Sequence, residues 1–497
     1  MTAALFWTPF LAVSVSALAG LAIFIAGEER ARLRIGLNLT AAVLKLVLVS
    51  LIGILVLQGY EPEFRFSLVP GLDLVLRADA LSLLFASLSA VLWLVTTVYA
   101  IAYLERSPNR ARFFGFFSLC VTATMGISMA GNLLTFFIFY ELLTLTTWPL
   151  VVHTGTAAAV RSGAKYLRYT LTGGAFFLIG LIWLYGITGP QGFSPGGTLT
   201  AYAGEYRNSL QIIFFLLAAG LGVKAALFPL HGWLPAAMVA PAPVSALLHA
   251  VAVVKAGAFG LIRLVEDVYG SSLLTELSLD VPLMSIAAFT ILYGSFQALR
   301  QIDLKKRLAF STVSQVSYII LGIAIGGPIA TIGGLVHLVH QGVMKIILFF
   351  CAGIFANLLG AKRIDQLDGI GRRMPWTSTC FTIGALGMVG LPPIAGFISK
   401  WYLGAGAVAD SHEWIIAVLV LSTLLNASYF LPVLKRIWLH APPDEWPAEV
   451  VVGKMEIGGL VGPAIVAAAL ALSMGVLAGH PLSPLSWVRD IVGAYSP

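Results

Sequence analysis

Six basic side chains and one acidic side chain fall inside long apolar runs of the chain, where charge is rarely placed without a role. A charge at the centre of a bilayer costs about 2.5–3.5 kcal/mol on insertion scales, so such residues usually serve a function. Glu141, Lys224 and Lys255 lie near the middle of their runs, and ionisation of Glu141 can set whether a nearby lysine holds its proton. The chemistry that these types suggest is proton transfer or ion movement. The full set is Lys45, Arg168, Lys224, Lys255, Lys345, Lys400 and Glu141.

Histidines accompany two of these lysines. His249 precedes Lys255 by six residues, and His337 and His340 precede Lys345. Imidazole titrates near neutral pH and can relay protons, although a hydrogen-bonded, inert core histidine is an equal alternative for each.

Arg168 and Lys45 have weaker claims to a function than the other basic residues of the apolar runs. Arg168 lies near the end of its run, where a long side chain can reach the interface, and we expect that explanation to hold for it. Lys45 has no evident partner, and both a functional and a structural role stay open.

Two of the lysines lie on overlong apolar runs that proline interrupts. Lys224 comes five residues before Pro229, and Lys400 comes seven residues after Pro393. Proline removes a backbone donor and opens a helix. Broken helices at membrane depth typically line wet cavities in ion-coupled transporters, whereas a simple packing kink is the alternative.

The elements that position these residues are membrane spans, each needing about 20 mostly apolar residues. The chain is 59% apolar and 11% charged with a mean hydropathy of +0.92, against about 25% charged residues in soluble domains, which excludes an ordinary soluble enzyme. We predict an all-α membrane protein with about fourteen spans, near residues 4–26, 35–58, 80–103, 112–130, 133–152, 166–187, 209–239, 243–265, 281–299, 308–326, 329–359, 376–408, 413–434 and 456–479.

Alternate loops carry most of the basic residues, which predicts that these loops are cytoplasmic. The opposite loops hold few basic residues and contain an acidic cluster that we place outside the spans, from Glu266 and Asp267 to Glu276 and Asp280. We therefore predict a multi-pass protein of the cell (inner) membrane with both termini on the outer side. The sequence Ala17-Leu18-Ala19 resembles a signal cleavage site, but no Lys or Arg precedes Arg30, so we expect no cleavage.

Other features limit the function. The net charge of +7 is spread over short loops, so no nucleic-acid partner is expected. Cys120, Cys351 and Cys380 lie far apart in apolar runs, and the chain has no C-x-x-C, Walker loop or G-x-G-x-x-G. We expect no cofactor and no metal site in this chain, and any redox chemistry would belong to a partner.

Two segments outside the spans have recognisable character. The alternating apolar residues between Gly59 and Arg77 predict a small hairpin outside the membrane. The polar stretch from Pro442 to Pro447 predicts a linker before the last span rather than a docking motif.

Several motifs resemble the antiporter-like membrane subunits shared by respiratory complex I, membrane-bound hydrogenases and Mrp-type cation/proton antiporters. They are Glu141 in its span, Gly222–Pro235 around Lys224, Ala240–His249, Lys255-Ala256-Gly257 and Gly390–Lys400. The resemblance covers nearly the whole chain. Lysine at 400 and the absence of a long lateral helix make the D-type Mrp subunit the better match.

The resemblance implies a fold with two inverted five-helix repeats and with broken helices 7 and 12. The domains would be 1–110 with three spans and the hairpin, 111–265 as the first repeat (spans 4–8), 280–437 as the inverted repeat (spans 9–13), and 438–497 as linker and span 14. It also implies a row of ion-translocating residues. In this row Glu141 and Lys224 form an ion pair, Lys255 is the central relay, Lys400 is the far lysine, and a polar axis connects them through His249, His337, His340 and Lys345.

One spacing departs from many relatives, because His340 and Lys345 are five residues apart rather than four. The path through that span therefore stays open. The leading hypothesis is a proton-translocating subunit of a multisubunit membrane complex, with sodium as a candidate exchange ion. The alternatives are a pump arm of an NADH- or ferredoxin-linked quinone reductase or hydrogenase, a passive scaffold or carbon-uptake subunit, and, last, a solute carrier with its own pocket.

Overall fold

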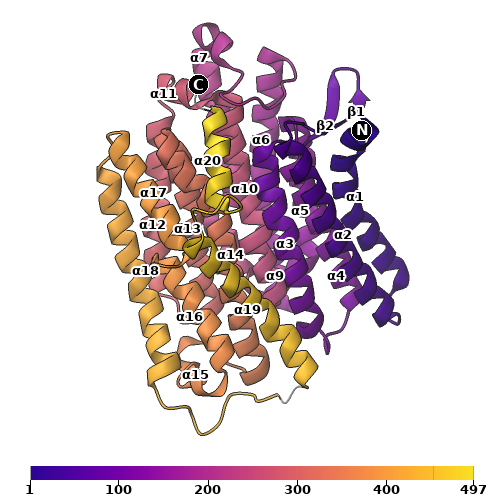
Figure 1. The fold of residues 1–497 in the computed structure, drawn as a ribbon, viewed down its shortest axis with the longest axis vertical. Helices are drawn as coiled ribbons and strands as arrows, with labels where there is room; N and C mark the ends of the chain where they lie inside the picture. The colour runs from indigo at the N-terminus through magenta and orange to yellow at the C-terminus, as the bar shows by residue number, and fades with distance from the viewer. Residues whose placement is uncertain (1, 451–452, 496–497) are drawn as a thin grey trace.

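Residues 2–450 and 453–495 are described by a computed structural model in which long helices run roughly parallel to one another (Figure 1). The described ends of the chain and the hairpin lie at the same end of the molecule. The elements of the first half are α1 (Thr2–Ala26), α2 (Ala31–Leu57), β1 (Glu63–Val69), β2 (Leu72–Arg77), α3 (Ala80–Tyr103), α4 (Arg110–Ser128), α5 (Leu133–Val151), α6 (Ala157–Thr188), η1 (Thr200–Tyr202), α7 (Ala203–Ala225), η2 (Leu230–Gly232), α8 (Trp233–Ala236), η3 (Ala237–Val239), α9 (Ala242–Ala246), η4 (Leu247–Val251), α10 (Val253–Ile262) and η5 (Arg263–Tyr269).

The second half continues the bundle and ends in a helix that crosses its face. α19 runs obliquely across the front of the bundle in Figure 1 and packs on α3, α14 and α16. The elements are α11 (Ser271–Glu276), α12 (Asp280–Leu299), α13 (Leu304–Ile325), α14 (Pro328–Leu359), η6 (Ile364–Gln366), α15 (Ile370–Arg373), α16 (Pro375–Val389), α17 (Ala395–Ala409), α18 (Trp414–Leu439), α19 (Lys454–Val476) and α20 (Pro484–Tyr495).

Thirteen helical segments of the described residues are long and apolar enough to cross a membrane. The predicted twelfth span is absent from this set because it consists of two helices of 15 residues, α16 and α17. The prediction of an all-α membrane protein with about fourteen spans is confirmed when this pair is added. Breaks interrupt the seventh span after α7 and the twelfth span between α16 and α17, as predicted.

Short polar side chains begin several of the helices. The Asp79 carboxylate accepts a hydrogen bond from the Ser82 amide, and Asn132 and Thr156 do the same at the starts of α5 and α6. Such caps satisfy amide groups that have no partner within the helix. They fix where each span starts between the short loops.

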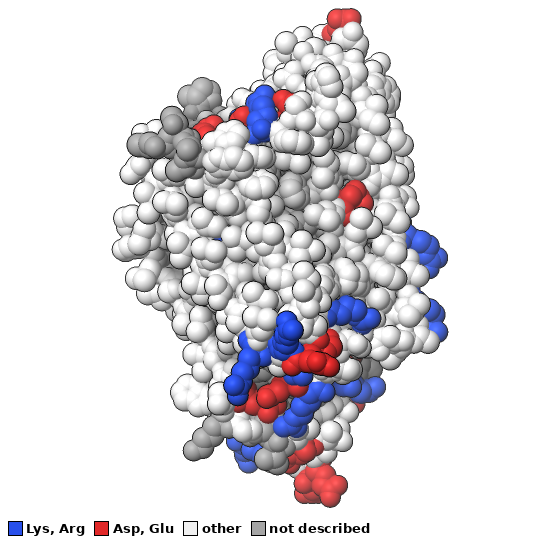
Figure 2. Space-filling model, turned by 90° about the vertical axis from the view of Figure 1, so that its right-hand side faces the viewer, with Lys and Arg blue, Asp and Glu red and all other residues white. Residues whose placement is uncertain are grey.

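The core lies where α10, α13 and α14 meet, and nearly all residues of these helices are buried. Helices α1, α2, α6 and α18 form the periphery and expose large apolar side chains such as Leu18, Val47 and Ile182. Figure 2 shows Lys and Arg gathered toward one end of the molecule, below a broad band with few charges. This arrangement suits a protein that lies in a bilayer.

Three parts of the structure refine the sequence prediction. The predicted hairpin is confirmed, with β1 antiparallel to β2 and Phe66 opposite Leu74. The segment Pro442–Pro447 has no helix or strand, as predicted for a linker. The helix α20 was not predicted; it packs on α14 and α3, where the Trp487 indole donates to the Ala80 carbonyl at 3.1 Å.

Candidate functional site

The first predicted pair lies on two neighbouring spans. Lys224 occupies the last turn of α7, is fully buried, and donates a hydrogen bond to the Tyr140 carbonyl on α5. Its ammonium also lies over the Tyr140 ring, 3.3 Å from the ring centroid, in a cation–π contact. Glu141, the next residue on α5, points toward α6, where a Cβ on Gly174 would lie 2.5 Å from its Oε1 atom. Glu141 and Lys224, both described, therefore lie close together without forming a salt bridge.

The break after α7 is held open by its own contacts. Ala226 adopts a left-handed conformation, with φ of +59°, and ends the helix one residue after Ala225. The Trp233 indole donates to the Val223 carbonyl at 2.7 Å, which satisfies one of the last carbonyls of the helix. Gly257 of α10 packs directly on the backbone at Lys224 and Ala225, so that the broken end of α7 meets the central helix.

The central residues are fully buried, and they lie on η4, α10 and α14. Lys345 donates to the Ser311 hydroxyl at 2.8 Å and to the Leu308 carbonyl at 3.2 Å on α13. His337 shares a hydrogen bond of 2.7 Å with Ser399, the neighbour of Lys400. The residues of this set are His249, Lys255, His337, His340 and Lys345.

Some polar atoms in this central region have no hydrogen-bond partner among the described residues. They include the Lys255 ammonium and both ring nitrogens of His249 and of His340. The side-chain amides of Gln315 and Gln341 also have no hydrogen-bond partner among the described residues. Buried polar groups are normally satisfied, and ordered water serves this role where protein groups do not. The region is therefore suited to hold water between the lysines.

Lys400 lies beyond the second break and reaches back across it. Its ammonium donates to the carbonyls of Val389 at 2.7 Å and Met388 at 3.2 Å, at the end of α16, and to Thr423 at 3.4 Å. Gly390, with φ of +97°, ends α16 in the left-handed region that favours glycine. The last carbonyls of a helix have no partner within it and carry partial negative charge, so they can hold a cation without a carboxylate.

A chain of hydrogen bonds joins Lys345 to Lys400 through residues that the sequence did not reveal. The Tyr429 hydroxyl donates to the Ser311 hydroxyl at 2.8 Å and lies 2.6 Å from Asn426 Oδ1. The Asn426 amide in turn donates to the Met388 carbonyl at 3.4 Å, which Lys400 also contacts. Asn426 and Tyr429 belong to a group of polar residues between Ser422 and Tyr429 in an otherwise apolar span, and this group is the signal that could have identified them.

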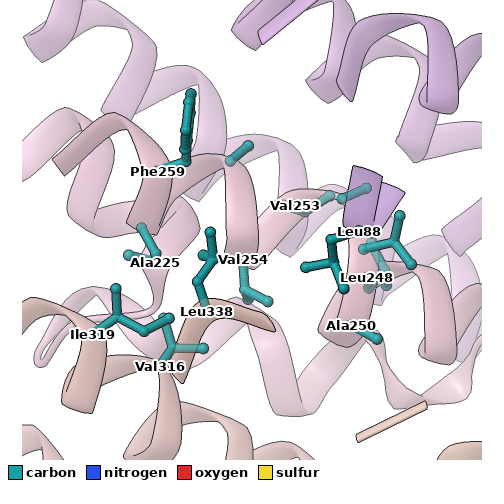
Figure 3. Packing of buried hydrophobic residues seen from close by; sticks show 14 of the residues in the cluster. Leu88, Ala225, Leu248, Ala250, Val253, Val254, Phe259, Val316, Ile319 and Leu338 are labelled. Atoms are coloured by element: carbon teal, nitrogen blue, oxygen red, sulfur yellow. The ribbon is translucent and has the colours of Figure 1, made fainter. Parts of the chain in front are cut away.

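Apolar packing surrounds this polar row. Side chains from η4, α7, α10, α13 and α14 meet in the middle of the bundle, as Figure 3 shows for Ala225, Val254, Val316, Ile319 and Leu338. These residues join the helices that carry Lys224, Lys255 and Lys345. Lys224, Lys255 and Lys345 are thus enclosed by closely packed apolar groups, and each has 0% of its surface exposed.

One end of the bundle contains a hollow of about 810 Å³. Its lining includes His153, Ala242, Lys305, Lys306 and Lys362. His153 follows α5 outside the membrane-spanning segment; burial, together with the positive charge of Arg112, lowers the pKa of His153 to about 4, so its imidazole is neutral at pH 7. Ala242, at the start of α9, is the residue of this lining that belongs to the helical segment carrying His249, two turns later.

One prediction about acidic residues needs correction. Glu141 was expected to be the only acid deep within a span, and Glu266 and Asp267 were placed in a loop. Instead the helix continues from α10 through η5 to Tyr269, and both carboxylates are buried, with exposures of 4% and 1%. The apolar residues Val268 and Tyr269 beyond the acids are the signal that the helix extends past residue 265.

Lys45 and Arg168 also differ in environment. Lys45 is fully buried on α2 and donates to the Ser16 hydroxyl at 2.5 Å, with the Trp93 ring 5.0 Å away. Arg168 lies on the exposed side of α6, which agrees with the expectation that its side chain reaches out of the span.

Comparisons with known proteins identify the family that this chain resembles. Residues 130–426 match the family described as NADH:quinone oxidoreductase/Mrp antiporter, transmembrane. The chain is 36% identical over 394 residues to NADH-quinone oxidoreductase subunit N of Desulforudis audaxviator, covering 78% of this chain and 75% of that protein. It is 26% identical over 444 residues to the D-type subunit of the Na(+)/H(+) antiporter of Bacillus subtilis, covering 89% and 86%.

A solved structure shares the fold. A chain of the Mrp complex from Dietzia sp. DQ12-45-1b superposes with a TM-score of 0.86 at 23% identity, covering 100% of both chains. The family match spans more than half of this sequence and includes both broken spans. The chain therefore belongs to the NADH:quinone oxidoreductase/Mrp antiporter family of membrane subunits.

Proposed function

We propose that this chain moves protons across a membrane along a row of titratable residues that are buried in its middle and half-buried at Glu141 and Lys400, as one subunit of a multisubunit complex. The row starts at Glu141 and Lys224, passes Lys255, His249, His337, His340 and Lys345, and ends at Lys400. The observation that carries the proposal is the continuous line of polar contacts from Lys345 to Lys400 through Ser311, Tyr429, Asn426 and the Met388 carbonyl.

The placement of Glu141 beside Lys224 supports a lysine that gains and loses its proton over one that stays permanently charged. Glu141 lies next to the carbonyl that binds Lys224, so protonation of Glu141 changes the field at the lysine. Two such groups titrate as a coupled pair. Moving one charge through 100 mV corresponds to about 2.3 kcal/mol, comparable with the energy of modest changes in lysine protonation.

The sidedness of the proposal follows from the loops. The hollow lined by Lys305, Lys306 and Lys362 lies at the end that carries most basic loops, which we assign to the cytoplasm as the inlet. Both termini then face the outer side, where they lie together with the hairpin (Figure 1).

The domain division is part of the proposal. Residues 111–265 and 280–437 form inverted five-span repeats, flanked by 1–110 and 438–497. The two breaks support this division, because the interrupted span is the fourth of five in each repeat.

Proton flux in everted vesicles that contain the parent complex tests the proposal. Lys224→Ala and Glu141→Ala should abolish flux while the complex still assembles. Arg168→Ala provides the control, because this basic residue lies on an exposed helix face and should leave flux unchanged. Wild-type flux in Lys224→Ala, with normal assembly, would reject the proposal.

The choice of driving reaction has two candidates. Exchange with sodium, as in a D-type Mrp subunit, is supported by the Bacillus subtilis relative, which is named as part of a Na(+)/H(+) antiporter. A pump arm of a quinone oxidoreductase or hydrogenase is supported by the higher identity to the NADH-quinone oxidoreductase relative. Purification from the native host in mild detergent, followed by mass spectrometry, separates them. Flavin or iron–sulfur subunits would indicate the redox enzyme, and multi-spanning partners without redox cofactors would indicate the antiporter.

A further inference from the structure

Glu266 is a buried carboxylate that the proposed row does not use. It lies on η5, at the end of the bundle opposite the hollow, and only 4% of its surface is exposed. Its Oε1 atom accepts a hydrogen bond of 3.4 Å from Thr331, in the first turns of α14. No Lys, Arg or His of the described residues lies within salt-bridge distance of it. A buried carboxylate without a cation partner is expensive to maintain, so a role for it is expected.

Glu266 lies on the helical segment that carries Lys255. The two residues are eleven positions apart, and the segment continues between them from α10 into the π-helical turns of η5. Thr331 connects Glu266 to α14, and the same helix carries His337 and Lys345, which lie within electrostatic range of Lys255. Glu266 therefore extends the line of the central relay toward the outer end of the bundle.

The charged groups beside Glu266 balance one another before Glu266 is counted. Arg263 donates to Asp267 at 2.6 Å, to Asp79 at the start of α3 at 2.8 Å, and to Ser82 at 2.8 Å. Arg77 also acts on Asp79, and Tyr495 of α20 faces the same cluster. The Glu266 carboxylate is therefore the uncompensated charge of this cluster, and its negative charge favours the arrival of a proton.

A loop between α6 and η1 covers this cluster. Its amides donate to the carbonyls of Glu266 (from Gly196, 3.1 Å), Asp267 (from Ser194, 3.2 Å) and Val268 (from Thr198, 2.9 Å). The Phe193 ring lies against the Arg263 guanidinium at 5.2 Å. The loop is bound by a few backbone hydrogen bonds, and it is the layer between Glu266 and the surface at this end.

We propose that Glu266 is the outlet of the proton path: Lys345 and Lys400 exchange protons with the Lys255 region, and Glu266 receives protons from that region and releases them at the outer face. The carboxylate takes a proton, forming an O–H bond as an O–H bond of a water molecule between the two groups breaks, and this water regains a proton as an N–H bond of the donor ammonium breaks. The protonated carboxyl then gives this proton to water on the outer side and returns to carboxylate. This inference rests on the proposed function, because it names the exit of the same path.

The test compares Glu266→Gln, which keeps the shape but cannot ionise, with Glu266→Asp, which keeps the acid. Both are measured as proton flux per assembled complex in everted vesicles. Glu276→Gln is the matched control, since it makes the same chemical change at an exposed position of the neighbouring helix α11. Lys224→Ala, measured in the same vesicles, tests the proposed function separately.

We expect Glu266→Gln to lower flux at least tenfold, Glu266→Asp to recover at least a third of it, and Glu276→Gln to leave it unchanged. Flux within twofold of wild type in Glu266→Gln overturns the outlet. An equally low flux in Glu266→Asp also overturns it, because a structural role would not distinguish an acid from an amide. If Lys224→Ala alone abolishes flux, only the outlet fails; if it does not, the proposed function fails as well.

Discussion

The first interrupted span carries Lys224 before its break, whereas the second carries Lys400 after its break. Lys224 points away from its own helix to the Tyr140 carbonyl and ring on α5, next to Glu141. Lys400 points back across the break to the last carbonyls of α16. Both lysines lie at interrupted helices, with Lys224 fully buried and Lys400 half-buried, and the groups that compensate their charges differ in kind.

Lys224 lies beside a group that can titrate, Glu141, whereas Lys400 binds carbonyl groups whose partial charges are fixed. Glu141 can gain or lose a proton, so the field at Lys224 can change during transport. The carbonyls of Met388 and Val389 are permanent dipoles at a helix end, and they stabilise a cation at Lys400 by a constant amount. We infer that the first break is where protonation is switched, and that the second receives protons through the chain from Lys345.

Replacing each lysine with arginine should break transport at both sites but affect stability at only one. Arginine stays charged in proteins, so Lys224→Arg and Lys400→Arg should each lower proton flux at least tenfold. Lys224 lies fully buried against an aromatic ring, so a larger head group must displace its neighbours. At 400, the planar guanidinium can bind the same two carbonyls.

Flux in vesicles and the melting temperature in detergent measure these two effects. We expect a lower melting temperature for Lys224→Arg and an unchanged one for Lys400→Arg. Substantial flux in Lys400→Arg would contradict the view that this lysine must release its proton. Equal destabilisation of both variants would remove the contrast between the two breaks.

Cutting the hydrogen-bonded chain should slow transport through the second half by about three- to tenfold, since water can replace part of the path. Asn426→Leu removes the contact with the Met388 carbonyl, and Tyr429→Phe removes the contact with Ser311. Ser428→Ala is the matched control, because this exposed hydroxyl bonds only to its own helix. Flux within twofold of wild type in the double variant would show that Lys345 and Lys400 exchange protons by another route.

The sequence predicts the spans and breaks because each depends on local composition. Apolar length places Lys224 in a span, and proline five residues later predicts the end of its helix. The hairpin follows from alternating residues near Phe66 in the same way. By contrast, the contact of Lys400 with α16 depends on how the two short helices α16 and α17 are placed on either side of the break, which spacing along the chain does not determine.

The missed residues show the same limit. Asn426 and Tyr429 are ordinary polar residues until packing brings α18 against α13 and α16. Glu266 was assigned to a loop because its charge lowers the local hydropathy of a segment that is otherwise apolar. In the structure, the pairing of Arg263 with Asp79 stabilises the burial of this segment. Sequence composition identifies charged residues in the middle of a span, whereas tertiary contacts determine which charged residues at the end of a span can be buried.

Glycine substitutions at the two breaks should separate close packing from backbone conformation. Gly257→Ala places a Cβ against the backbone of Ala225, so the α7–α10 contact must open, at a cost of about 1–3 kcal/mol. Gly390→Ala must adopt φ of +97°, also at about 1–3 kcal/mol, but its Cβ meets the flexible stem of Lys400. We therefore expect thermal unfolding to show the larger loss for Gly257→Ala.

Gly186→Ala is the control for this pair, because a Cβ at this position of α6 meets no atom within 4 Å. Alanine is favoured over glycine within a helix, so stability should not fall. A larger loss for Gly390→Ala than for Gly257→Ala would mean that backbone strain, rather than helix contact, dominates at the breaks.

The smallest effect is expected at Thr423, whose hydroxyl accepts the longest of the three hydrogen bonds from Lys400, at 3.4 Å. Thr423→Val keeps the shape and leaves the bonds to Met388 and Val389 in place, so flux should fall by less than twofold. A larger fall would mean that a side chain on α18, rather than the end of α16, holds the Lys400 charge. The main partner of the Lys400 ammonium would then be the Thr423 hydroxyl. The carbonyls at the end of α16 would no longer be the fixed dipole that distinguishes Lys400 from Lys224, which lies beside the titratable Glu141.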